Sequence, residues 1–200
     1  QFVIDRLLEL TDQYEFEITS LKTKGDKILD VALSKIGDKG LFTKELEAGL
    51  LCGRIDFAVH SMKDMPTELP EGLQISSMLK RHNPADVLIS ERYASFAALP
   101  EGAKVGTSSL RRRAQLLHAR PDLDIHDLRG NLQTRMRKMK EQNFDAIVLA
   151  AAGVERLGWQ DLITEELDYE VCLPAVGQGV IGVETRSDDE EILKLVQLVN

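Results

Sequence analysis

The sequence has few cysteines, few aromatic residues and no long apolar run. Cys52 and Cys172 are its two cysteines, and neither has a CxxC partner, so we expect no disulfide framework and no metal site. No stretch approaches the roughly 18 apolar residues of a membrane-spanning helix, and no basic-then-apolar leader precedes Gln1. We therefore expect a cytoplasmic protein that does not enter a membrane.

Positive charge is in the minority and is unevenly distributed. The chain of 200 residues has a formal net charge of -8, yet residues 104–140 carry ten Lys or Arg against three Asp. Hydrophobic residues make up 43% and charged residues 29% of the chain, which is ordinary for a globular protein of one domain or two small ones. The basic segment is therefore a local feature with its own purpose.

Nucleic acid is one possible partner for a basic segment, but the composition argues against it. Aromatic residues are only 5% of the chain and do not alternate with the arginines, as they do on surfaces that stack bases. The arginines also fall at predicted strand ends rather than along one helix face. We expect no nucleic-acid partner.

The order of predicted elements indicates an α/β protein of two domains. A hinge is expected at "LKRHNPAD", and a Gly-rich turn, "AVGQG", precedes a last strand and a helix capped at Ser187 that return to the first domain. Domain 1 is predicted to span 1–80 plus 178–200, and domain 2 to span 85–177. Over residues 1–90, the sequence predicts strands at 15–21, 54–60, 74–78 and 86–90 and a helix at 41–51.

Domain 2 repeats a strand-turn-helix unit three times, which predicts parallel strands. The carboxyl ends of parallel strands form the ligand-binding edge of an open sheet, so side chains in the three turns should lie near one another. The expected strands are 103–105, 123–128 and 146–150, and the turns that follow them begin near residues 106, 129 and 152.

Two arginines in the first helical turn of domain 2 predict an anion-binding site. Arg111 and Arg112 lie where the helix dipole disfavours cations, so local stability does not account for them, whereas an external anion would. Thr107 and Ser109 would add hydroxyl donors. Arg129, Arg135 and Arg156 follow the other strands and should converge on the same edge, which indicates a ligand with several carboxylates. The alternative is a solvated charged face.

The segment "HSMKDMP" is a second candidate site. Lys63 and Asp64 directly follow a predicted buried strand, and a carboxylate beside a lysine and opposite many arginines should stay ionised. In a cleft for anions, such a carboxylate is useful only for a departing amine or a cationic intermediate. A structural Lys-Asp turn pair is the alternative, since ion pairs without chemistry are frequent.

Five motifs in order resemble the porphobilinogen deaminase family, also called the hydroxymethylbilane synthases. They are "HSMKDMPTELPEGL", "VGTSSLRRRAQ", "LRGNLQTRMRKM", "AAAGVERLGW" and "LPAVGQGVIGVE". The resemblance implies two α/β domains around a cleft, like type II periplasmic binding proteins, plus a small third domain. It implies a transferase of tetrapyrrole (haem and porphyrin) biosynthesis that joins four porphobilinogen molecules head to tail with release of ammonia. The growing chain is anchored to a dipyrromethane cofactor that is thioether-linked to a cysteine.

The resemblance also implies a role for each matching residue. Asp64 would be the catalytic carboxylate that stabilises positive pyrrole nitrogens and intermediates as ammonia leaves. Lys39, in "KIGDKGLF", resembles a mobile loop over the cleft and would contact substrate. Residues that would hold the cofactor are Ser61, Lys63, Asp64, Thr107, Ser109, Arg111, Arg112 and Arg135, and Arg129, Arg135 and Arg156 would bind the carboxylates of substrate and growing chain.

The chain departs from the family pattern at both ends. The opening strand expected before Gln1 is absent, and the sequence ends at Asn200 before the Gly-Gly-Cys motif that would carry the cofactor. We therefore expect the two cleft domains of a longer, monomeric protein without the third domain, inactive by themselves. The competing hypothesis is a noncatalytic module of the same architecture that binds a small anion, and Asp64 discriminates, because an anion trap gains nothing from a carboxylate.

Overall fold

The computed structural model describes residues 1–21 and 43–200, which divide into two compact units. Within the described residues, unit 1 comprises 1–21, 43–81 and 180–200, and unit 2 comprises 82–179. The sequence predicts the boundaries between domains 1 and 2 at residues 80–85 and 177–178. Each unit has its own sheet and its own hydrophobic clusters, as expected for an α/β protein.

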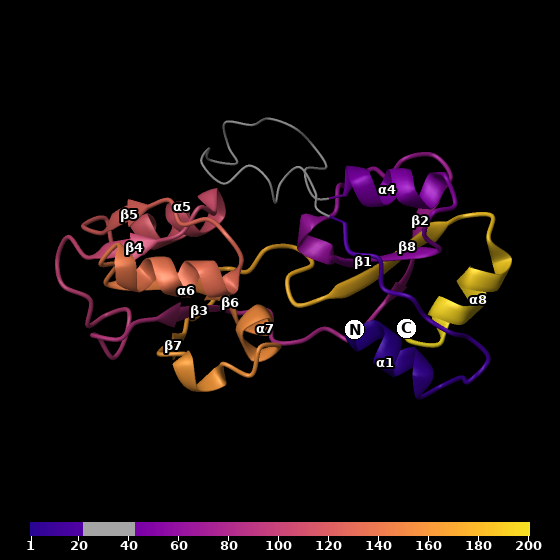
Figure 1. The fold of residues 1–200 in the computed structure, drawn as a ribbon. Coiled ribbons are helices and arrows are strands. Elements are labelled where there is room, and N and C mark those ends of the chain that lie inside the picture. The colour runs from indigo at the N-terminus through magenta and orange to yellow at the C-terminus, as the bar shows by residue number, and fades with distance from the viewer. Residues whose placement is uncertain (22–42) are drawn as a thin grey trace. The chain divides into compact units, whose positions relative to one another are not determined.

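Unit 1 is built on a three-stranded antiparallel sheet with the order β1-β8-β2 (Figure 1). The central strand β8 (Ile181–Arg186) comes from the end of the chain and pairs with β1 (Phe57–Ser61) and β2 (Leu73–Met78). Because side chains alternate across a strand, the sheet has two apolar faces. Helix α4 (Lys44–Leu51) covers one, and α1 (Phe2–Leu8) and α8 (Glu190–Gln197) cover the other.

Unit 2 contains a five-stranded mixed sheet with the order β5-β4-β6-β3-β7 (Figure 1). Strand β4 pairs in parallel with its neighbours β5 and β6, as the repeated strand-turn-helix pattern predicted. Strand β3 pairs antiparallel with β6 and β7, so the first residue of β3 lies at the same edge as the carboxyl ends of β4, β5 and β6. The strands are β3 (Asp86–Ile89), β4 (Lys104–Gly106), β5 (Asp124–His126), β6 (Ala146–Ala150) and β7 (Glu165–Glu166).

Helices pack on both faces of this sheet. Alternation along β6 sends Val148 into the cluster that contains Leu116 of α5, and Ile147 into the cluster that contains Met139 of α6. The two central strands, β3 and β6, are accordingly buried over almost their whole length. The helices of this unit are α5 (Leu110–Ala119), α6 (Leu132–Glu141) and α7 (Ala151–Glu155), and a 3-10 turn, η2, spans Gln160–Leu162.

Two predictions about local structure are wrong. Residues 15–21 form no strand, although their polarity alternates, because they make no ladder with another strand; Phe16 instead packs its ring 6.3 Å from that of Phe57. The last helix is capped by Asp189 rather than Ser187: the Asp189 carboxylate accepts a hydrogen bond from the backbone N–H of Ile192 at 3.2 Å. Alternating polarity thus identified a segment that packs against the core, but it did not show whether the segment pairs with another strand.

Candidate functional site

The turn between β4 and α5 is held by its own hydroxyl groups. Ser109 is the N-cap of α5, and its Oγ accepts a hydrogen bond from the backbone N–H of Arg112 at 3.3 Å. Thr107 is buried, and its Oγ1 accepts from the backbone N–H of Ser109 at 3.2 Å. Gly106 precedes them where a Cβ would approach Leu128 Cδ2 to 2.8 Å. The close packing below the turn therefore fixes where α5 begins.

The side chains of Arg111 and Arg112 both point to Asp86, the first residue of β3. Arg112 Nε and Nη2 lie 3.0 and 2.7 Å from Asp86 Oδ1, and Arg112 Nη1 donates to the carbonyl of Val148 at 3.1 Å. Arg111 Nη2 lies 2.7 Å from Asp86 Oδ2. The exposed fractions of these side chains are 27% for Arg111, 7% for Arg112 and zero for Asp86. This is a buried, charged cluster at the carboxyl edge of the sheet.

Two further side chains complete the shell of Asp86. Gln178 Nε2 donates to Asp86 Oδ1 at 2.9 Å and to the carbonyl of Pro84 at 2.6 Å. The thiol of Cys172 donates to Asp86 Oδ2 at 3.2 Å. Burial alone would raise the pKa of Asp86, but the charge and hydrogen bonds of Arg112, with help from Gln178 and Arg111, hold it below the usual range. The carboxylate therefore stays ionised in this cluster.

The lowered pKa of Asp86 predicts a loss of stability in acid. A carboxyl whose pKa is lower in the folded than in the unfolded chain stabilises the fold above the unfolded value of about 3.9. That contribution disappears as the pH falls through the folded value. We expect the thermal midpoint of the intact protein to fall more steeply below about pH 4 than that of the Asp86→Asn variant, measured by calorimetry. Parallel curves would contradict an ionised Asp86.

Cys172 is a poor candidate for covalent chemistry. Burial, together with the neighbouring Asp86 charge, raises the pKa of the Cys172 thiol to about 11, and a protonated thiol is a weak nucleophile. Cys52, the other cysteine, is also free, and it is exposed.

Within residues 1–21 and 43–200, no group of three or more His, Cys, Asp or Glu side chains is placed to hold a metal ion. No helix in these same ranges is long and apolar enough to cross a membrane.

The remaining predicted arginines of unit 2 lie after the neighbouring strands. The backbone N–H of Thr107 donates to the carbonyl of His126 at 2.9 Å, which joins the turn after β4 to the carboxyl end of β5, three residues before Arg129. Arg129 is buried. Arg135 lies in the first turn of α6, and its Nε donates to the carbonyl of Gly130 at 2.7 Å. Arg156 is exposed at the end of α7.

The predicted residues of the other candidate site belong to unit 1. Ser61 ends β1, and Lys63 and Asp64 lie in the 3-10 turn η1 (Met62–Asp64) with both side chains exposed. The backbone N–H of Met62 donates to the carbonyl of Val180 at 3.0 Å, which anchors the turn. One residue before Ser61, His60 is buried, and its Nε2 lies 2.9 Å from Glu184 Oε2. Lys39 lies outside the described residues.

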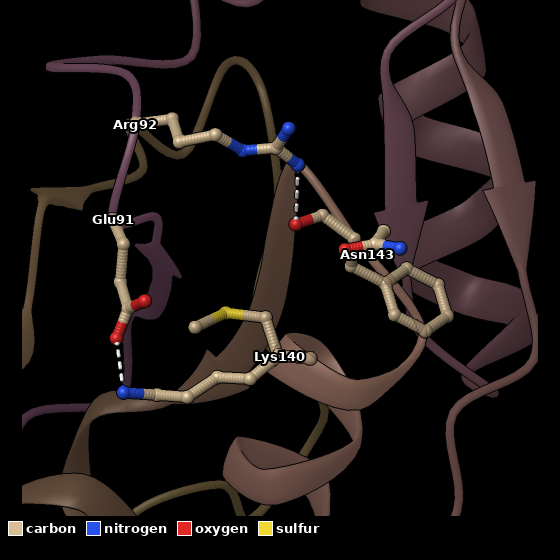
Figure 2. A pocket seen from close by; sticks show the side chains of 6 residues that line it. Glu91, Arg92, Lys140 and Asn143 are labelled. Carbon is tan, nitrogen blue, oxygen red and sulfur yellow. Dashed lines mark hydrogen bonds and ion pairs between the residues drawn. The ribbon is translucent and has the colours of Figure 1, made fainter.

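A pocket of about 260 Å³ lies at the opposite edge of the unit 2 sheet, where β3 ends and β6 begins (Figure 2). Its charged side chains are already paired. Lys140 Nζ lies 2.6 Å from Glu91 Oε1, and Arg92 Nη2 lies 2.8 Å from Asp145 Oδ1 and donates to the carbonyl of Phe144. None of the predicted site residues that the structure describes lines this pocket, and its balanced charges do not favour an anion.

Sequence reasoning missed Asp86 and Gln178 and misjudged why the arginines are there. The argument that local stability does not account for Arg111 and Arg112 overlooked the buried carboxylate of Asp86, which supplies an internal counterion. Gln178 was assigned only to a turn between domains, although it is 1% exposed and bonded to Asp86. An acidic residue opening an otherwise apolar strand was the available signal, since buried carboxylates require partners.

Comparison with known proteins gives a consistent result over almost the whole chain. Residues 1–194 match the family model described as "Porphobilinogen deaminase, dipyromethane cofactor binding domain". The chain is 59% identical over 197 residues to a protein named porphobilinogen deaminase in Desulforamulus reducens, covering 98% of this chain and 64% of the relative. A protein of the same name in Pelotomaculum thermopropionicum is 60% identical over 200 residues, covering 100% of this chain and 64% of the relative. The chain thus spans less than two thirds of these relatives.

Two solved structures with a similar architecture are distant from this chain in sequence. The periplasmic VFT2 domain of BvgS from Bordetella pertussis aligns with a TM-score of 0.54 at 16% identity, over 99% of this chain and 75% of that one. The probable amino-acid ABC transporter extracellular-binding protein ytmK from Bacillus subtilis aligns with a TM-score of 0.56 at 12% identity, over 98% of this chain and 76% of that one. These similarities establish the fold, an α/β architecture like that of periplasmic binding proteins, as the sequence predicted.

Proposed function

Because this chain belongs to the porphobilinogen deaminase family, we propose that the intact protein is a hydroxymethylbilane synthase. It joins four porphobilinogen molecules head to tail and releases ammonia at each step, as a transferase of tetrapyrrole biosynthesis. The observation that carries the proposal is the family match over residues 1–194 together with roughly 60% identity to proteins of that name. The chain contributes the part of the enzyme that the family model names for the cofactor.

The arginine cluster of unit 2 has the donors and charge that a carboxylate-bearing dipyrromethane needs. Arg111 and Arg112 carry two positive charges against the single charge of Asp86, so the cluster keeps a positive excess next to the start of α5. Charge-assisted hydrogen bonds from arginine to a carboxylate are each worth about 1.5–3 kcal/mol. In our proposal the residues that hold the cofactor are Ser61, Lys63, Asp64, Thr107, Ser109, Arg111, Arg112 and Arg135. When bound, the cofactor supplies the covalent anchor for the growing chain.

Substrate carboxylates would bind to the remaining arginines. Arg129 lies in the turn after β5, Arg135 lies near the start of α6, and Arg156 lies at the end of α7, the short helix that follows β6. Three guanidiniums suit a substrate with an acetate and a propionate arm, since each carboxylate accepts two parallel hydrogen bonds from one guanidinium. Lys39 is proposed as an additional contact to substrate.

Asp64 is the proposed catalytic residue. Its exposed carboxylate sits on a short turn that β1 and β8 hold in place. A carboxylate stabilises the positive charge that develops on the pyrrole of porphobilinogen as ammonia departs, and such electrostatic stabilisation is commonly the largest catalytic contribution. Since Asp64 would act on a cation, this role differs from that of the arginines, which bind anions.

The noncatalytic binding module is not proposed as a second function. The two solved structures described above are 16% and 12% identical to this chain and support the fold only, whereas relatives near 60% identity carry the name of the enzyme. We further propose that the intact protein is a cytoplasmic monomer that binds porphobilinogen and engages neither nucleic acid nor membrane.

The intact mass of the purified protein tests the proposed function directly. We expect a mass above that of the polypeptide by one dipyrromethane, in a preparation that consumes porphobilinogen and releases ammonia. The covalent anchor should survive denaturation, so acid-denatured protein is suitable for mass spectrometry. An active preparation with an unmodified mass would rule out the covalent cofactor, and a preparation that leaves porphobilinogen untouched would overturn the function.

A further inference from the structure

We propose that Asp86 is a positioning residue, whose carboxylate pairs with the buried guanidinium of Arg112 and holds that of Arg111 in the orientation that receives a ligand carboxylate. The proposal rests on the proposed function. Asp86 has no exposed side-chain surface, so it acts through the two arginines rather than by touching cofactor or substrate. It extends the site to the first residue of β3, outside the motifs that carry the resemblance.

The hydrogen bonds of Asp86 leave it little capacity for any other role. Its Oδ1 accepts from Arg112 Nε, Arg112 Nη2 and Gln178 Nε2, and its Oδ2 is approached by Arg111 Nη2 and the Cys172 thiol. A carboxylate offers about four lone-pair sites, which these five contacts use up. The carboxylate of Asp86 therefore restrains the side chains that bond to it.

The contacts of Arg111 restrain two of its three guanidinium nitrogens. Its Nη2 lies against Asp86, and its Nη1 donates to the carbonyl of Leu173 and contacts Cys172. Its Nε makes none of these contacts, and the side chain is partly exposed. Because both terminal nitrogens are bonded to other groups of the protein, the guanidinium cannot rotate freely. Less orientational entropy is then lost when a ligand binds.

The charge balance of the cluster supports the same conclusion. Arg112 is almost fully buried, and a buried guanidinium requires a counterion. One carboxylate shared by two guanidiniums satisfies Arg112 and still leaves positive charge for a ligand. A neutral residue in place of Asp86 would put two like charges side by side, and Arg111, the more exposed of the two, would turn toward solvent. The ligand-binding geometry would be lost even where the fold survived.

The test measures cofactor loading of the intact Asp86→Asn variant by intact mass. Asparagine keeps the size and one acceptor oxygen but removes the charge. We expect the loaded fraction to fall at least about 10-fold, since one charge-assisted contact is worth a factor of about 10 or more. Met139→Ala is the control: it removes a buried core side chain of the same unit that belongs to the other hydrophobic cluster and lines the pocket at the opposite edge of the sheet, and it should stay loaded.

A double variant separates positioning from a merely structural role. If Asp86 acts through Arg111, the Asp86→Asn/Arg111→Ala variant should be no less loaded than Arg111→Ala alone, because interacting residues are not additive. Additive losses would overturn the proposal. Full loading of Asp86→Asn, in a preparation series in which the wild type is also loaded, would overturn the positioning role of Asp86 as well. The proposed function would be unaffected by that result. Unmodified wild-type protein would instead refute the function itself.

A second variant covers the case in which Asp86→Asn does not fold. Asp86→Asn/Arg112→Gln replaces the buried ion pair with two amides and leaves no uncompensated buried charge at Arg112. We expect this variant to fold, by circular dichroism, and to be loaded less than Arg112→Gln alone, because Arg111 has lost its partner. Equal loading of these two variants would contradict the positioning role of Asp86.

Discussion

Asp64→Ala is expected to abolish porphobilinogen turnover by the intact protein while leaving its fold unchanged. Loss of a group that stabilises charge in the transition state commonly costs about 100- to 1000-fold in kcat. The side chain is exposed and belongs to a three-residue turn, so its removal leaves no cavity. Release of ammonia under single-turnover conditions is the measurement. Normal turnover would disprove the catalytic assignment.

Two companion variants distinguish charge from position. Asp64→Asn keeps the shape and hydrogen-bonding capacity of the side chain but not its charge, so it should be nearly as inactive as Asp64→Ala if the carboxylate stabilises a cation. Glu68→Ala removes another exposed carboxylate four residues along the same loop and should retain activity. An active Asp64→Asn would point to a hydrogen-bonding role instead.

Much of the fold follows from short-range patterns in the sequence. Strand β6, for example, is a run of apolar residues, Ala146–Ala150, followed at once by a helix, and the prediction gave the same bounds. Asn131, as the N-cap of α6, accepts a hydrogen bond from the backbone N–H of Thr134 at 2.8 Å. Hydrophobic periodicity is local, so a single sequence can reveal it, and caps are local too, although the cap of the last helix was predicted two residues too early, at Ser187 instead of Asp189.

Pairing between distant segments could not be predicted in the same way. Asp86 is 26 residues from Arg112 and 92 from Gln178, and nothing near any of these residues indicates that they meet. The alternating segment 15–21 failed for a related reason: alternation shows which side chains can face a core, but a strand also needs a neighbour with free N–H and C=O groups. The basic turn was found from sequence, whereas its internal counterion required the structure.

Arg112→Met is expected to destabilise the protein by about 3–5 kcal/mol, because removing one partner of a buried ion pair leaves the other charge poorly compensated. Arg112 is 6% exposed, and three of its N–H groups bond to Asp86 and to the carbonyl of Val148. Arg111 still faces Asp86 in this variant, which favours the lower end of the range. Urea unfolding followed by circular dichroism measures the loss.

Arg137→Met is the matched control, since Arg137 forms an exposed i,i+4 pair with Glu141 at 3.5 Å. Such pairs are worth only about 0.2–0.5 kcal/mol, so a comparable loss there would show that the effect of Arg112→Met does not come from burial.

The double variant Asp86→Leu/Arg112→Met tests whether the buried pair serves stability or cofactor binding. Apolar residues of similar size often replace a buried ion pair without loss of stability, and Arg111 can turn its guanidinium toward water because it is partly exposed. We therefore expect the double variant to lose much less stability than the sum of the two single changes. Its cofactor loading should nevertheless fall, because the arginine orientation depends on Asp86. A variant that keeps its stability but loses cofactor would indicate that the cluster serves ligand binding more than folding. Additive losses of stability would contradict a direct interaction between Asp86 and Arg112.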